Sequence, residues 1–123
     1  MKTTFLSLTL AVSLALGISA FAAPHHADTA PKPTLHKIEE NCKLVQDYAR
    51  IFEWENVDDA VDRIVAAEKK MLKAIEGKSD LKQQAGELHA AVKELRAARL
   101  NHNSERAIEA AEKVNKLAHD MEK

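Results

Sequence analysis

The sequence has few of the residues that interrupt helices. Its three prolines all lie at or before Pro33, and it has three glycines in 123 residues. Aromatic residues make up 4% of the chain, whereas hydrophobic residues make up 46% and charged residues 30%. A chain rich in Ala, Leu, Glu and Lys, and free of proline after Pro33, favours long uninterrupted helices. We therefore predict an all-α fold.

Cysteine and unbalanced charge are also scarce. Cys42 is the one cysteine, so the chain cannot form an internal disulfide, and packed apolar side chains must supply its stability. The formal net charge is −1, and charges of the two signs are interspersed along the chain without long blocks of one sign. This pattern argues against a nucleic-acid partner and against binding to an anionic membrane.

The first 22 residues have the pattern of a cleaved signal peptide. Lys2 precedes an apolar run over residues 5–18, which is too short for a permanent membrane span. Ala20, Phe21 and Ala22 then form a small-x-small cleavage pattern, which predicts a mature start at Ala23. We expect export to a bacterial periplasm and no membrane segment in the mature protein.

The region that follows the signal peptide is proline-rich and then strongly periodic. Residues 23–34 contain three prolines and two histidines, and we expect a disordered lead-in there. From Leu35 onward, apolar residues recur at alternating steps of three and four, which is the pattern of a helix with one buried stripe. Four such segments are predicted, over residues 35–52, 57–76, 80–100 and 105–121, with caps at Asn56 and Ser79.

Short connections between these segments predict an antiparallel up-down-up-down four-helix bundle over residues 35–123. Glu68 falls on the apolar stripe of the second segment. It is either a tolerated polar residue near the edge of the stripe, which we favour, or a buried carboxylate that needs a partner. We expect the bundle to be monomeric.

In this topology the start of the first helix lies beside the end of the last. Cys42 would then face the neighbourhood of His119 in the fourth helix. Spare volume at this end would form a pocket, a common location for a cofactor in a bundle. We expect the pocket to be lined by Met71, Leu72, Ile75, Ala85, Leu88 and Met121.

Two short segments resemble the soluble cytochrome b562 family of exported four-helix bundles. Ile38-Glu39-Glu40-Asn41-Cys42 is similar to that family's Leu-Glu-Asp-Asn-Met in the first helix. Residues 107–114, Ala-Ile-Glu-Ala-Ala-Glu-Lys-Val, resemble its Ala-Gln-Ala-Ala-Ala-Glu-Gln-Leu in the fourth. The resemblance implies a non-covalent b-type haem and one-electron transfer with a redox partner that the sequence does not identify.

The residues at the family's iron-ligand positions differ here. Cys42 stands where the family has its methionine, and Glu122 stands where it has its histidine, with His119 one turn earlier. By resemblance, Cys42 and His119 are the candidate axial ligands of the haem iron. Thiolate and imidazole ligation together would give a lower reduction potential than methionine and histidine, because a thiolate stabilises ferric iron.

Each candidate ligand also has a structural interpretation. Cys42 fits a small buried apolar residue, or the site of a disulfide between two molecules. His119 fits a solvated residue that complements the dipole at the end of its helix. Loss of haem would leave a helical binding or scaffold protein as the alternative function.

A metal-binding protein is a further alternative. His25 and His26 lie near the expected mature start, but Pro24 lacks the amide that the amino-terminal copper motif needs. The sequence has no phosphate loop, nucleophile elbow, HExxH or CxxC, so we predict that the protein is not an enzyme.

Overall fold

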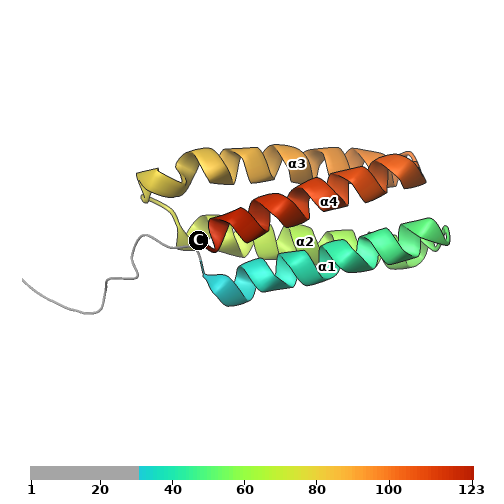
Figure 1. Cartoon of the computed structure of the whole chain (residues 1–123), viewed down its shortest axis with the longest axis horizontal. Helices are drawn as coiled ribbons and strands as arrows, with labels where there is room; N and C mark the ends of the chain where they lie inside the picture. Colours follow the sequence, from blue (N-terminus) through green and yellow to red (C-terminus); the bar gives the residue numbers. More distant parts are fainter. Residues whose placement is uncertain (1–30) are drawn as a thin grey trace, which may run out of the picture.

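The computed structural model describes residues 31–123, and these form an antiparallel four-helix bundle without strands (Figure 1). The helices are α1 (Lys32–Arg50), α2 (Trp54–Ala74), α3 (Lys82–Leu100) and α4 (Ser104–Met121), and a short 3-10 turn, η3 (Ser79–Leu81), leads into α3. The predicted all-α up-down-up-down fold is confirmed. The expected signal peptide and most of the expected lead-in lie outside the described residues.

The core is built from the apolar stripes that the periodicity indicates. Helix α1 packs against both α2 and α4, and α3 packs against α4 and more loosely against α2. Burial of these side chains is the main favourable term in the folding free energy. No disulfide among the described residues adds to it. The largest fully buried side chains are Leu35, Ile38, Val45, Val57, Val61, Ile64, Met71, Leu88, Val92, Leu95 and Val114.

The start of α1, the carboxyl end of α4 and the α2–α3 connection lie at one end of the bundle (Figure 1). The α1–α2 and α3–α4 turns lie at the other end. This places the beginning and the end of the folded chain side by side, as the short connections predict. No helix among residues 31–123 is long and apolar enough to cross a bilayer.

Two helices begin earlier than the sequence pattern suggests. Helix α1 starts at Lys32 with Pro33 in its first turn, so the expected disorder is wrong for residues 32–34. Proline fits there because the amide that it lacks would have no partner within the helix. Helix α2 starts at Trp54, directly after Glu53. Asn56, the expected cap, therefore lies inside the helix, and its side-chain amide donates a 2.6 Å hydrogen bond to Oε1 of Glu53.

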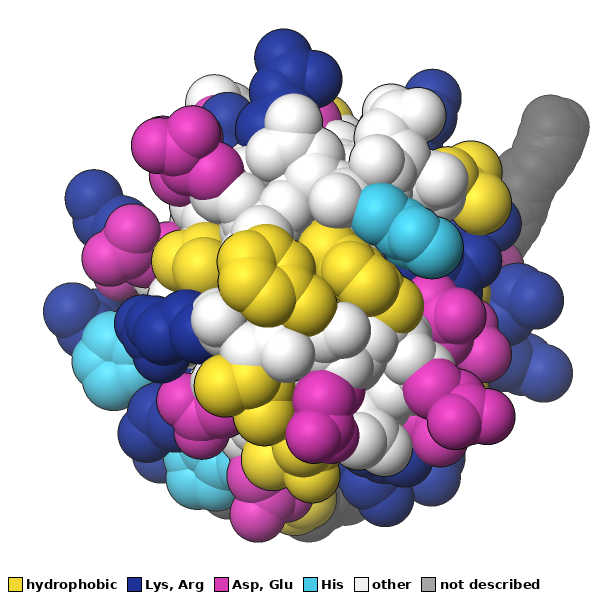
Figure 2. Space-filling model, turned by 90° about the vertical axis from the view of Figure 1, so that its right-hand side faces the viewer, with side chains coloured by type: hydrophobic (Ala, Val, Ile, Leu, Met, Phe, Trp, Pro, Cys, Tyr) yellow, Lys and Arg dark blue, Asp and Glu magenta, His cyan; other side chains and the backbone are white. Residues whose placement is uncertain are grey.

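The turns at the far end have a common backbone geometry. Helices α1 and α3 are each followed by a non-glycine residue in the left-handed region, Phe52 at φ 59° and His102 at φ 50°. The rings of Trp54 and His102 stack with centroids 4.9 Å apart, which joins the two turns. Exposed apolar side chains gather at this end, namely Ile51, Phe52 and Leu100 (Figure 2).

Glu68 is a buried carboxylate, and our preferred interpretation of it as an edge residue is wrong. The residue is 3% exposed, and its Oε2 atom lies 3.0 Å from Nδ1 of His89 on α3. The charge is tolerated on the stripe because an imidazole on the facing helix supplies a partner. Periodicity gave the position of Glu68 but could not give the position of His89.

Candidate metal centre

Cys42, the expected thiolate ligand, is enclosed in the core. Its side chain is 0% exposed, among the buried apolar residues of all four helices. Burial raises the pKa of the Cys42 thiol from 9.0 to about 12, because desolvation disfavours the charged form. The sulfur is therefore a neutral thiol at physiological pH, which agrees with the interpretation of Cys42 as a small core residue. Its burial does not suit a disulfide between two molecules.

His119, the expected imidazole ligand, lies on the surface of the bundle. Its side chain is 60% exposed, and Nδ1 lies 3.8 Å from Oε1 of Glu39 on α1. The two candidate ligands thus belong to different environments, one in the core and one on the surface between α1 and α4. Neither residue lines any of the three main grooves in the described part of the chain.

The six expected pocket-lining residues separate into two groups. Met71, Leu88 and Met121 are buried in the core, at 3% exposure or less. Leu72, Ile75 and Ala85 line an open groove of about 410 Å³ at the α2–α3 connection. Neither Cys42 nor His119 lines that groove. The residues present therefore do not fit a haem held between these two ligands, and haem binding stays a prediction from the resemblance.

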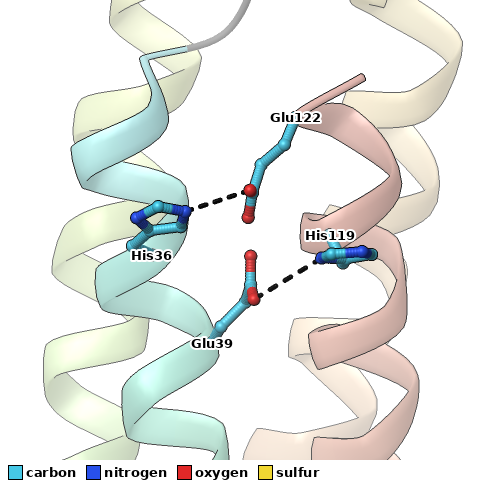
Figure 3. A network of polar contacts seen from close by, with 4 residues as sticks. All are labelled: His36, Glu39, His119 and Glu122. Atoms are coloured by element: carbon cyan, nitrogen blue, oxygen red, sulfur yellow. Dashed lines mark hydrogen bonds and ion pairs between the residues drawn. The ribbon is translucent and has the colours of Figure 1, made fainter.

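A different group of four polar side chains does come together at this end of the bundle. His36 and Glu39 project from the first turns of α1, and His119 and Glu122 from the end of α4 (Figure 3). Nε2 of His36 lies 3.0 Å from Oε1 of Glu122, and His119 pairs with Glu39 as described above. Each histidine therefore contacts the glutamate of the opposite helix.

The local sequence explains this crossed arrangement. His36 and Glu39 are three residues apart, as are His119 and Glu122, so each pair lies on one face of its helix. Because α1 and α4 are antiparallel, the histidine of one helix lies level with the glutamate of the other. The bundle topology therefore brings two His-x-x-Glu pairs into one site.

The carboxylates of Glu39 and Glu122 point toward one another between the helices (Figure 3). Their side chains are 20% and 14% exposed, respectively. The Oε1 atoms face the histidines, whereas both Oε2 atoms are buried and have no hydrogen-bond partner. Two facing carboxylates with unsatisfied oxygens are costly unless a cation compensates them.

The donor set suits a transition-metal ion. One ligand atom from each of His36, Glu39 and Glu122 lies within 4.8 Å of the others, and the imidazole of His119 adjoins Glu39. Imidazole nitrogen and carboxylate oxygen together favour Zn²⁺, Cu²⁺ or Ni²⁺, whereas Mg²⁺ and Ca²⁺ prefer oxygen alone. The exposed histidines leave an entry path from solvent.

The sequence analysis interpreted His119 as a haem ligand or as a solvated residue at the end of its helix, and it did not single out His36, Glu39 or Glu122 as metal ligands. The signal that could have found them was the His-x-x-Glu spacing, which occurs near the start of the first predicted helix and again at the end of the fourth. No protein-family model, no curated protein and no solved structure matches this chain. The candidate site therefore stands on its own geometry.

Proposed function

We propose that this protein binds a divalent transition-metal ion, such as Zn²⁺, Cu²⁺ or Ni²⁺, between α1 and α4. The observation that carries the proposal is the pair of buried, unpartnered Oε2 atoms of Glu39 and Glu122. A divalent ion between them would replace a repulsion with two strong contacts. His36 and His119 would complete the coordination from opposite sides.

The geometry needs only side-chain adjustment to reach coordination. Bonds from zinc to nitrogen and oxygen are about 2.0–2.2 Å, so the ligand atoms must approach one another more closely than they do here. The four side chains project from two rigid helices, and rotation about their χ angles can draw the donor atoms together. Metal binding would then join the first turns of the bundle to the last.

We place this function in the periplasm, as a bundle released by signal cleavage. The support is the pattern of Lys2, the apolar run and the Ala20 to Ala22 site. The bundle has no inward Glu-x-x-His pairs of the kind that build di-iron centres, so we propose binding, storage or delivery of metal and no catalysis.

Electron transfer through a b-type haem is the competing proposal, and its support is the resemblance of residues 38–42 and 107–114 to the cytochrome b562 family. It would require Cys42 to lose its proton and leave the core, and His119 to turn inward. The metal proposal requires neither change.

Competition with a chromophoric chelator would test the proposal by giving the affinity for Zn²⁺. We expect Glu39→Gln with Glu122→Gln to weaken zinc binding by about tenfold or more, since both anionic ligands are lost. The matched control is Glu40→Gln with Glu112→Gln, which removes the same charge from exposed positions on the same two helices. Equal affinity in the two double variants would refute the site.

A second variant locates the metal on the bundle and not on the chain before it. His25→Ala with His26→Ala removes the histidines near the expected mature start, which lie outside the described residues. We expect this change to leave zinc affinity unaltered, while His36→Ala with His119→Ala lowers it. The opposite result would assign the metal to the residues that precede α1.

A further inference from the structure

A groove between α1 and α2 is lined by three cationic side chains and by no acidic one. It has a volume of about 420 Å³, and its lining residues are Pro33, Thr34, Lys37, Arg63, Ala66, Ala67 and Lys70. Within residues 31–123, none of the three cations takes part in an ion pair. The groove therefore carries positive charge that the folded chain does not neutralise.

Arg63 is held in place by a buried amide. Asn41 on α1 is 3% exposed, and its Oδ1 accepts a 2.7 Å hydrogen bond from Nε of Arg63. The Asn41 amide nitrogen in turn donates to the backbone carbonyl of Lys37 at 2.8 Å. These two hydrogen bonds hold the Arg63 guanidinium by its Nε edge. The terminal Nη groups of Arg63 are then free to bind a ligand.

The first turn of α1 contributes to the same groove. Pro33 and Thr34 lie in this turn, which contains no acidic residue and has no side-chain cap. The amino-terminal end of a helix carries a partial positive charge and attracts anions. Here that charge adds to those of Lys37, Arg63 and Lys70.

We propose that this groove binds a phosphomonoester group, of a small molecule or of a lipid headgroup. A guanidinium fork matches two phosphate oxygens in geometry, and two lysines add charge for a dianion. Pro33, Ala66 and Ala67 supply apolar contact for the carbon part of the ligand. The inference is independent of the metal proposal, because the two sites share no residue.

A second groove, formed by the other pair of helices, provides a matched control. Between α3 and α4, a groove of about 390 Å³ is lined by Arg106 and Lys113, but also by Glu94 and Glu109. Nζ of Lys113 lies 3.7 Å from Oε1 of Glu94. Removing Arg106 and Lys113 changes the net charge as much as removing Arg63 and Lys70, without touching the proposed site.

Calorimetric titration with inorganic phosphate and with phenyl phosphate would test the proposal. We expect Arg63→Gln with Lys70→Gln to weaken binding by about tenfold or more, since charge-assisted hydrogen bonds are lost. Arg106→Gln with Lys113→Gln should leave the affinity unchanged. Equal weakening in both variants would mean that bulk charge attracts the anion, and the proposal would fall.

Sedimentation with vesicles distinguishes the two sources of the phosphate group. Binding to phosphatidylcholine vesicles that contain phosphatidic acid, but not to phosphatidylcholine alone, would identify a lipid headgroup. Binding of the free phosphates without vesicle binding would identify a small molecule. Failure to bind any of these probes would overturn the inference.

Arg63→Lys tests whether the guanidinium fork that Asn41 holds is needed for binding. The variant keeps the charge but loses the fork and its Nε contact. We expect weaker phosphate binding and a lower melting temperature, because the buried Oδ1 of Asn41 loses its donor. An affinity equal to that of the wild type would show that charge alone is sufficient, which contradicts a built site.

Discussion

Glu68 on α2 and His89 on α3 form a polar pair, 3.0 Å apart, across the loosest of the four helix contacts. The carboxylate is 5% exposed, whereas the imidazole is 54% exposed. The pair therefore consists of one group that depends on its partner and one that water can still solvate. This asymmetry makes the two residues unequal in their effect on stability.

His89→Ala should destabilise the bundle by about 1–2 kcal/mol, because it leaves the buried Glu68 carboxylate without its partner. The partial exposure of His89 keeps the effect at the low end of the range for buried pairs. Glu68→Leu should be nearly neutral, since it replaces the charge with apolar packing of similar volume. Urea unfolding, followed by circular dichroism, gives the free energy of unfolding of both variants. A His89→Ala variant as stable as the wild type would contradict the argument.

The buried thiol of Cys42 predicts a loss of stability at high pH. Its pKa is raised to about 12 in the folded chain from 9.0, so above pH 9 the unfolded chain ionises while the folded chain does not. The stabilising contribution is full below pH 9 and falls as the pH rises, by about 1.4 kcal/mol per unit at most. Comparing the wild type with Cys42→Ala at pH 8 and pH 10 isolates this effect.

The Cys42→Ala variant should be less stable than the wild type by about 1–2 kcal/mol at pH 8, through the lost packing of the sulfur. The difference between the two proteins should shrink at pH 10. A difference that stays constant would mean that the thiol titrates near its ordinary pKa and is accessible to water.

Zinc should stabilise the folded protein by mass action. At a zinc concentration of about one hundred times the dissociation constant, we expect a gain of about 2.7 kcal/mol, seen as a higher melting temperature. The gain arises because the site exists only when α1 and α4 are packed together. Glu39→Gln with Glu122→Gln should reduce the gain to about 1.4 kcal/mol or less, because affinity falls by tenfold or more, while Glu40→Gln with Glu112→Gln should retain it.

Titration with haemin decides between the metal and haem proposals. From the burial of Cys42 and the outward position of His119, we expect no low-spin spectrum with reduced α and β bands. If such a spectrum does appear, Cys42→Ala and His119→Ala identify its ligands. Loss of the spectrum in both variants would support the resemblance over the metal centre.

The candidate metal site illustrates how spacing and topology must be combined. Three His-x-x-Glu pairs can be read from the sequence, at residues 36–39, 102–105 and 119–122. The antiparallel order of the helices, which can also be predicted, places the first and the third at the same end of the bundle. The sequence does not show how α1 and α4 are rotated about their own axes, and it is this rotation that turns the two faces toward each other. The crossed pairing of His36 with Glu122 depends on that rotation.

The helices themselves follow from the sequence, because a three-and-four spacing of apolar residues can bury one stripe only as a helix. The same stripes place Cys42, Met71 and Leu88 in the core. Flank residues are different, because a shift of one position around the helix turns them from solvent toward a neighbour. Only the tertiary structure could decide that Glu68 meets His89, that Asn41 holds Arg63, and that His119 faces Glu39 and not the core. Each of these contacts joins residues far apart in sequence, and its distance is set by how whole helices pack.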